Sequence, residues 1–163
     1  MTERVTRVKY GLFAGIFLSL LLTGVVSSSD ISSMVYIEDL REEARQVSDN
    51  ELVLLIEFSS ADCPYCRELE QDFLLPMQRN AGYGKKVLIR SVSLDAYETI
   101  IDFDGRSIPT SKFASRYNVM VTPTMVFLDA RGNEVSKKLV GIWSTDYFGG
   151  YIDERIDEAR TKL

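Results

Sequence analysis

Helical and strand-like patterns of hydrophobic residues alternate along most of the chain. Apolar residues at helical spacing, separated by charged ones, predict a helix over residues 37–47. Residues 52–58 form a nearly continuous apolar run, which is typical of a strand covered on both faces. Residues 64–75 predict a second helix that begins and ends near a proline, and residues 87–94 predict a second central strand.

The second half of the chain begins with a stretch that lacks clear periodicity. Residues 95–111 contain Asp, Gly and Pro at irregular spacing and predict a long loop, which a short helix over 112–117 follows. Two strands joined by a turn are expected next, and then a final amphipathic helix. The strands cover 124–128 and 134–140, and the apolar stripe of the helix runs through Phe148, Ile152, Ile156 and Ala159. This order predicts an α/β fold with one mixed sheet of about four strands, flanked by helices on both sides.

The first thirty residues differ from the rest of the chain. Arg4, Arg7 and Lys9 precede an apolar run over residues 11–26, and a serine-rich stretch follows it. This order is typical of a secretory signal peptide, and the run is also close to the length of an N-terminal membrane anchor. We therefore expect a signal or anchor over residues 1–30 and a folded domain over 31–163. The domain is expected in the periplasm or another extracytoplasmic space, either soluble after cleavage or anchored by this segment.

Composition narrows the possible chemistry. The chain has 163 residues, a net charge of −5, two cysteines and no histidine. Catalysis by Ser-His-Asp or Cys-His groups is thereby excluded within this chain, as are metal sites with histidine ligands. Residues 1–28 carry a net +2, so the remainder carries −7. An acidic domain of this kind argues against nucleic acid as a partner, since phosphate binding needs a basic surface.

The two cysteines lie in the sequence Cys63-Pro64-Tyr65-Cys66, directly after the predicted strand and at the start of a predicted helix. Backbone N–H groups and the helix dipole favour an anion at that place, so Cys63 is the candidate nucleophile. Cys66 lies one turn further on, where it can attack a mixed disulfide formed at Cys63. A structural disulfide across so short a loop constrains the unfolded chain little, and a zinc site needs thiolates from a second chain.

Two further features accompany the dithiol. Glu57 interrupts the apolar strand just before it, and a buried carboxylate with a raised pKa suits proton exchange with thiols. The alternative is a carboxylate at the strand edge that points to solvent. Pro123 follows Thr122 immediately before another predicted strand, either as an ordinary strand-start residue or as a cis-proline in a tight turn.

These motifs together resemble the thioredoxin superfamily, from about Ile37 to the C-terminus. The resemblance implies a thioredoxin fold in which Pro123 is cis and faces the dithiol, and in which backbone at Thr122 pairs with an extended substrate. Pro64 and Tyr65, between the cysteines, are further candidate substrate contacts. Glu57 falls where the family has its buried acidic proton shuttle. The resemblance implies no cofactor beyond a redox-active Cys63–Cys66 disulfide.

The chain is most similar to exported bacterial thioredoxin-like proteins, including those encoded with sulfur-oxidation systems. It departs from cytosolic thioredoxins at Asp62, where they have tryptophan; this charge opposes formation of a Cys63 thiolate, and Arg67 is a candidate to offset it. The family's first strand is also hard to identify before Ile37, which leaves open a sheet with one strand fewer.

The leading hypothesis is therefore an exported thiol–disulfide oxidoreductase, more a reductase than an oxidant. It predicts client proteins with thiols or disulfides, and a membrane thiol-electron carrier as partner. The alternative is a binding module that holds a client or copper(I) without turnover, with Met120 or Met125 as a soft third ligand beside the cysteines. Trp143 and Tyr65 are candidates to line a client groove.

Overall fold

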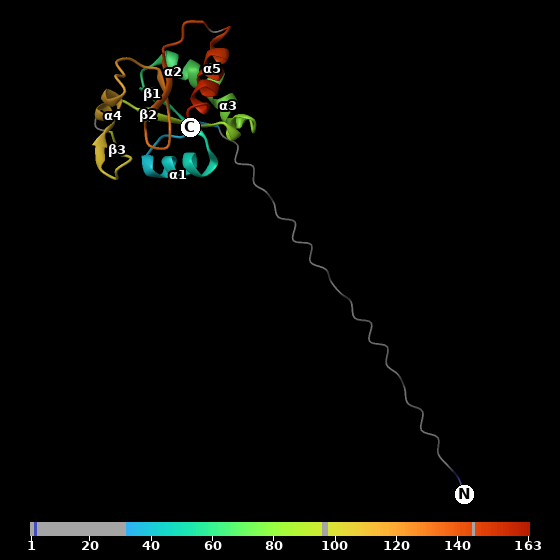
Figure 1. Ribbon diagram of the computed structural model, residues 1–163. Coiled ribbons are helices and arrows are strands. Elements are labelled where there is room, and N and C mark those ends of the chain that lie inside the picture. Colours follow the sequence, from blue (N-terminus) through green and yellow to red (C-terminus); the bar gives the residue numbers. More distant parts are fainter. Residues whose placement is uncertain (1, 3–31, 96–97, 145) are drawn as a thin grey trace.

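The computed structural model describes residues 2, 32–95, 98–144 and 146–163 (Figure 1). The predicted signal or anchor over residues 1–30 lies outside the described residues, apart from residue 2, so it stays a prediction. No helix in the described part of the chain is both long and apolar enough to cross a membrane.

A mixed sheet of four strands in the order β2-β1-β5-β6 forms the centre of the domain. Strand β1 (Val53–Ser59) is parallel to β2 (Val87–Ser93) and antiparallel to β5 (Thr124–Leu128). Strand β6 (Glu134–Val140) pairs antiparallel with β5 across the predicted turn. Every residue of β1 is buried, because helices cover both faces of the sheet. The predicted sheet of about four strands flanked by helices is confirmed.

The helices divide between the two faces of the sheet (Figure 1). Since side chains alternate along a strand, Val53 and Leu55 of β1 pack toward one face and Leu54 and Ile56 toward the other. The first face is covered by α2 (Pro64–Leu69), the π-helix η1 (Glu70–Leu74), α3 (Leu75–Arg79) and α5 (Phe148–Arg160). The second is covered by α1 (Leu40–Asn50) and α4 (Thr110–Arg116); a short 3-10 helix, η2 (Tyr83–Lys85), precedes β2.

The predicted first helix begins three residues later than expected. The side chain of Asp39 accepts a hydrogen bond from the backbone N–H of Arg41 at 2.9 Å, so α1 begins at Leu40. The segment before it is extended: Tyr36 bridges to Ser91 of β2 in parallel, and the Ile37 N–H donates to the Ser91 carbonyl at 2.9 Å. This single bridge occupies the place of the family's first strand, which is hard to identify in the sequence before Ile37.

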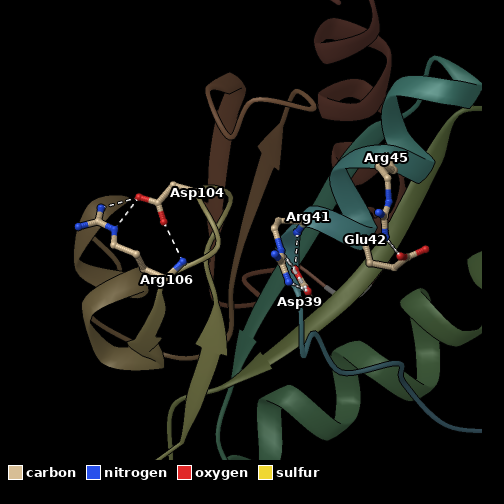
Figure 2. A network of polar contacts seen from close by, with 6 residues as sticks. All are labelled: Asp39, Arg41, Glu42, Arg45, Asp104 and Arg106. Atoms are coloured by element: carbon tan, nitrogen blue, oxygen red, sulfur yellow. Dashed lines mark hydrogen bonds and ion pairs between the residues drawn. The ribbon is translucent and has the colours of Figure 1, made fainter.

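Residues 95–111, expected to form a loop, contain a small antiparallel hairpin instead. Strand β3 (Thr99–Ile101) pairs with β4 (Ser107–Pro109), and Ile101 also bridges to Asp39. Three-residue strands are too short for alternation to be visible in a sequence. Ion pairs lie on both sides of the bridge between Asp39 and Ile101 (Figure 2). Two of them, Asp39–Arg41 and Glu42–Arg45, are at the start of α1, and the third, Asp104–Arg106, is at the hairpin turn.

The predicted helix over residues 64–75 also continues further than expected, to Arg79. It does so through the π-helical turn η1, in which the Leu75 N–H donates to the carbonyl of Glu70. The wider turn lets Pro76 enter the first turn of α3, where its missing N–H costs no helical hydrogen bond. The proline therefore marks an irregularity in the helix and not its end.

Candidate active site at the start of helix α2

The two cysteines form a disulfide at the start of α2. Cys63 is the N-cap residue and Cys66 lies in the first turn; their sulfurs are 2.07 Å apart. The backbone N–H of Cys66 donates to the Cys63 sulfur at 3.1 Å. Pro64 occupies the first helical turn, where no N–H donor is required. The Cys63 sulfur therefore sits at a helix terminus whose dipole and N–H group stabilise a negative charge.

The loop before Cys63 is held by side chains from two other segments. The N–H of Ala61 donates to both carboxylate oxygens of Asp95, at 3.1 and 3.2 Å, and the Arg67 guanidinium donates to the Ala61 carbonyl at 3.2 Å. Asp62 is exposed, and among the described residues no ion pair joins it to Arg67. Arg67 thus fixes the loop backbone and does not pair with Asp62.

The peptide bond between Thr122 and Pro123 is cis, as the resemblance implies. The hydroxyl oxygens of Thr122 and Ser60 lie 3.2 Å apart, which places this turn beside the loop that leads into Cys63. The carbonyl of Pro123 accepts a hydrogen bond from the Gly141 N–H at 2.8 Å, so it is anchored to the end of β6. The structure thus brings the candidate substrate contacts Thr122 and Pro123 to the loop that carries Cys63.

Glu57 is fully buried on the sheet face that α2 covers, not at a solvent-facing strand edge. The Ser91 hydroxyl donates to its Oε2 at 3.3 Å, and Oε1 has no hydrogen-bond partner among the described residues. Burial, followed by the charge of Glu70, raises the pKa of Glu57 to about 9. Its carboxyl therefore carries a proton at neutral pH and can donate it to a thiolate.

The sequence patterns did not single out Glu70, which lies near Glu57. The Ser59 hydroxyl donates to a Glu70 oxygen at 3.4 Å, and burial raises the pKa of Glu70 as well. When two carboxylates lie close together, the repulsion between their negative charges disfavours ionisation of both. The pair therefore shares one proton and carries one negative charge. The signal available in the sequence was spacing: Glu70 lies four residues after Cys66, on the same side of the helix.

A row of side chains links this buried pair to the surface. Tyr36 bridges to Ser91, Ser91 is opposite Glu57, and Glu57 is opposite Met125 on β5. Residues directly opposite on neighbouring strands point to the same face of the sheet. Tyr36 is half exposed, and burial and the charges of Glu70 and Glu57 raise its pKa. The buried carboxyl of Glu57 is thus one short polar row away from solvent.

Several large apolar side chains stay exposed on the chain segments around the dithiol. Tyr65 and Trp143 line one pocket together, so the two expected groove residues do meet. Met120 and Val121, which precede the cis-proline, are 87% and 55% exposed, whereas Met125 is buried in the core. No group of three or more His, Cys, Asp or Glu side chains in the described part of the chain is arranged to hold a metal ion.

Comparison with solved structures supports the same fold. A DsbH oxidoreductase is 14% identical, with a TM-score of 0.56 over 77% of this chain and 86% of that chain. A thioredoxin h mutant from poplar is 17% identical, with a TM-score of 0.53 over 79% and 86%. A thioredoxin-like protein from Clostridium perfringens is 21% identical, with a TM-score of 0.50 over 83% and 91%. At these identities the likeness establishes the fold alone.

The search of curated proteins gave no match. A family model described as a thioredoxin-like domain matches residues 40–156, which include the dithiol, Glu57 and the cis-proline. The match covers more than half of the chain and agrees with the four-stranded sheet and the position of the disulfide. The chain therefore belongs to the thioredoxin-like family.

Proposed function

We propose that this protein is an exported thiol–disulfide oxidoreductase that exchanges disulfides with client proteins and acts mainly as a reductase. The observation that carries the proposal is the Cys63–Cys66 disulfide at the start of α2, the helix that covers the sheet face on which Glu57 is buried. Both groups needed for exchange, a sulfur nucleophile and a proton donor or acceptor, are thereby present on one face of the sheet.

In the reducing direction the dithiol supplies two electrons. The Cys63 thiolate attacks one sulfur of a client disulfide; a bond forms between Cys63 and the client, and the other client thiolate leaves and takes a proton from water. Cys66 then loses its thiol proton to the ionised form of Glu57, which is the minor form at neutral pH but a strong base because its pKa is about 9, and attacks the Cys63 sulfur, which releases the second client thiolate. The products are the Cys63–Cys66 disulfide, a reduced client and a protonated Glu57, the form that its raised pKa favours.

The charges near the dithiol support the reducing direction. Glu57 and Glu70 form an acidic pair near α2, and Asp62 directly precedes Cys63. Negative charges disfavour a thiolate, whereas strong oxidants of this chemistry stabilise it. We expect the pair to have a reduction potential nearer to about −270 mV, as in a reductase, than to about −120 mV, as in an oxidant.

The export part of the proposal rests on residues 1–30 of the sequence, with their basic start and apolar run. Outside the cytoplasm a reductase has to be reduced again after each turnover, so a membrane thiol-electron carrier is the partner we propose. The resemblance to thioredoxin-like proteins encoded with sulfur-oxidation systems likewise rests on the sequence alone.

A trapping experiment tests the exchange reaction. Cys66→Ser leaves Cys63 able to attack but removes the thiol that resolves the mixed disulfide, so clients accumulate covalently bound to Cys63. Cys63→Ser is the matched control and should trap far less protein. The wild-type domain should also reduce insulin in the presence of dithiothreitol. Absence of both trapped clients and insulin reduction would sink the proposal.

The same protein preparations distinguish the binding-module alternative. A copper(I) carrier in its reduced form would retain one copper per chain and show no exchange with a dithiol buffer. Of the two candidate sulfur ligands, Met120 is exposed to solvent and Met125 is buried in the core. Measured copper retention together with absent disulfide exchange would replace the oxidoreductase proposal with this one.

A further inference from the structure

A pocket of about 350 Å³ lies beside the dithiol, between α2 and the segment that follows β6. Its lining residues are Tyr65, Glu68, Ile142, Trp143, Ser144 and Asp146. Tyr65 is separated from Cys63 by one residue, and Ile142 follows Gly141, whose N–H binds the carbonyl of Pro123. The pocket is therefore tied to both the nucleophilic cysteine and the cis-proline turn.

Aromatic rings form the apolar part of this pocket. Tyr65 is 60% exposed and Trp143 is 54% exposed. The Trp143 ring packs edge-on against Phe148, at 5.0 Å between centroids, and in a tilted arrangement against Tyr151 at 5.5 Å, so two other rings hold its orientation. An exposed aromatic ring that is already held in place can bind a partner with little loss of side-chain freedom.

The charged part of the pocket is entirely negative. Glu68 and Asp146 are its only charged lining residues, and within the described ranges neither forms an ion pair or a side-chain hydrogen bond. Arg67, the neighbour of Glu68, is directed to the carbonyl of Ala61 instead. A ligand that satisfies these groups has to be cationic, and it needs a flat or aliphatic part that contacts the rings.

We propose that this pocket binds a lysine or arginine side chain that lies close to the reactive cysteine of a client protein. The cation contacts the faces of Tyr65 and Trp143, and Glu68 and Asp146 neutralise its charge. The proposal rests on the proposed exchange function and specifies its substrate class: disulfides flanked by basic residues. A client with an acidic residue at that place is repelled by the same two carboxylates.

Binding can be measured without any redox step, because Trp143 is the only tryptophan in the chain. The probes are blocked peptides in which serine replaces the reactive cysteine and the neighbouring residue is Arg, norleucine or Glu. The Arg peptide should change Trp143 fluorescence with an affinity about five- to tenfold above that of the norleucine peptide, since an exposed ion pair and a cation–π contact each contribute modestly. Equal affinity for Arg and norleucine would overturn the proposal.

Exchange kinetics provide the second measurement, with the same peptides carrying cysteine as symmetrical disulfides. The wild-type protein should reduce the Arg peptide with a kcat/KM more than about tenfold above that of the Glu peptide, which the two carboxylates repel, and 0.5 M salt should shrink the preference. The double variant Glu68→Gln/Asp146→Asn should lose most of the preference, keeping only the part that the aromatic rings contribute, yet still reduce the norleucine peptide. Asp49→Asn, an exposed carboxylate on α1 across the sheet, is the matched control and should retain it.

The outcomes separate this proposal from the function on which it rests. If no peptide is reduced, the exchange function fails, and the fluorescence titration still decides whether the pocket binds a cation. If all peptides are reduced at one rate and bind equally, the pocket proposal fails while the exchange function stands. A preference for Arg that is undiminished in the double variant would also contradict the assignment to Glu68 and Asp146.

Discussion

Replacing Glu57 by glutamine should remove most of the pH dependence of stability that this buried carboxyl causes. In the folded protein its pKa is raised from 4.5 to about 9, first by burial and then by the charge of Glu70. The folded state therefore binds the proton more tightly than the unfolded state does. As the pH rises from 4.5 toward 9, the unfolded chain ionises freely while the folded chain does not, so the free energy of unfolding falls.

The size of the effect follows from the shift. Each pH unit between the two pKa values lowers the free energy of unfolding by about 1.4 kcal/mol. At pH 7, which is 2.5 units above the ordinary pKa of 4.5, Glu57 has cost the folded state about 3 kcal/mol. Glutamine does not titrate, so Glu57→Gln avoids this loss. Its buried amide adds a difference of its own, but that difference is the same at every pH.

Urea unfolding of the oxidised protein, followed by far-UV circular dichroism at pH 4.5, 5.5, 6.5 and 7.5, measures this directly. The stability of Glu57→Gln relative to wild type should rise by about 3 kcal/mol between pH 4.5 and 7. Glu70→Gln removes the second cause of the shift, so its decline should end at a lower pH than that of wild type.

Asp49→Asn, at an exposed carboxylate on α1, serves as the control variant. A difference between Glu57→Gln and wild type that stays constant within about 0.5 kcal/mol from pH 4.5 to 7 would refute the reasoning. It would mean that water or a cation reaches the carboxyl and that it ionises in the folded state as it does in the unfolded chain.

Two further predictions concern stability at pH 7. Gly132→Ala should lower the free energy of unfolding by about 2 kcal/mol, because φ is +81° and the new Cβ would lie 2.6 Å from the Phe103 ring. The control is Gly84→Ala, which has open space around it and should change the free energy of unfolding in urea by less than about 0.5 kcal/mol. Arg116→Met leaves the buried carboxylate of Asp102 unpaired and should cost about 2 kcal/mol after allowance for the partial exposure of Arg116. Arg116 lowers the pKa of Asp102, so the pair stabilises the folded state above pH 3.8, and the measured cost should shrink progressively as the pH falls from 3.8 toward the lowered pKa. A cost unchanged at pH 3 would contradict the ion-pair explanation.

Long periodic segments were predictable because their pattern depends on neighbours within one turn or a few strand positions. The stripe from Phe148 to Ala159 identified α5, and all of its four expected residues are buried. The apolar run over 52–58 identified β1 within one residue at each end. Two helix boundaries differ from the predicted ones. The Asp39 cap makes α1 begin at Leu40, three residues later than predicted, and the π-helical turn η1 lets the next helix continue beyond Pro76.

At the site, the sequence by itself determined the dithiol at a helix start, the carboxylate before it and the proline before β5, because each is a motif of a few adjacent residues. Only the tertiary structure decided which distant groups surround them. Strand pairing and register, which no local pattern encodes, place Ser91 and Tyr36 in one row with Glu57. The packing of η1 on the same face of the sheet brings Glu70 close to it. Likewise, folding of the segment after β6 against α2 places Trp143 and Asp146 beside Tyr65. The pair of cysteines at a helix start is thus encoded locally in the chain, whereas the pKa of Glu57 and the shape of the pocket between Tyr65 and Trp143 depend on contacts that exist only after folding.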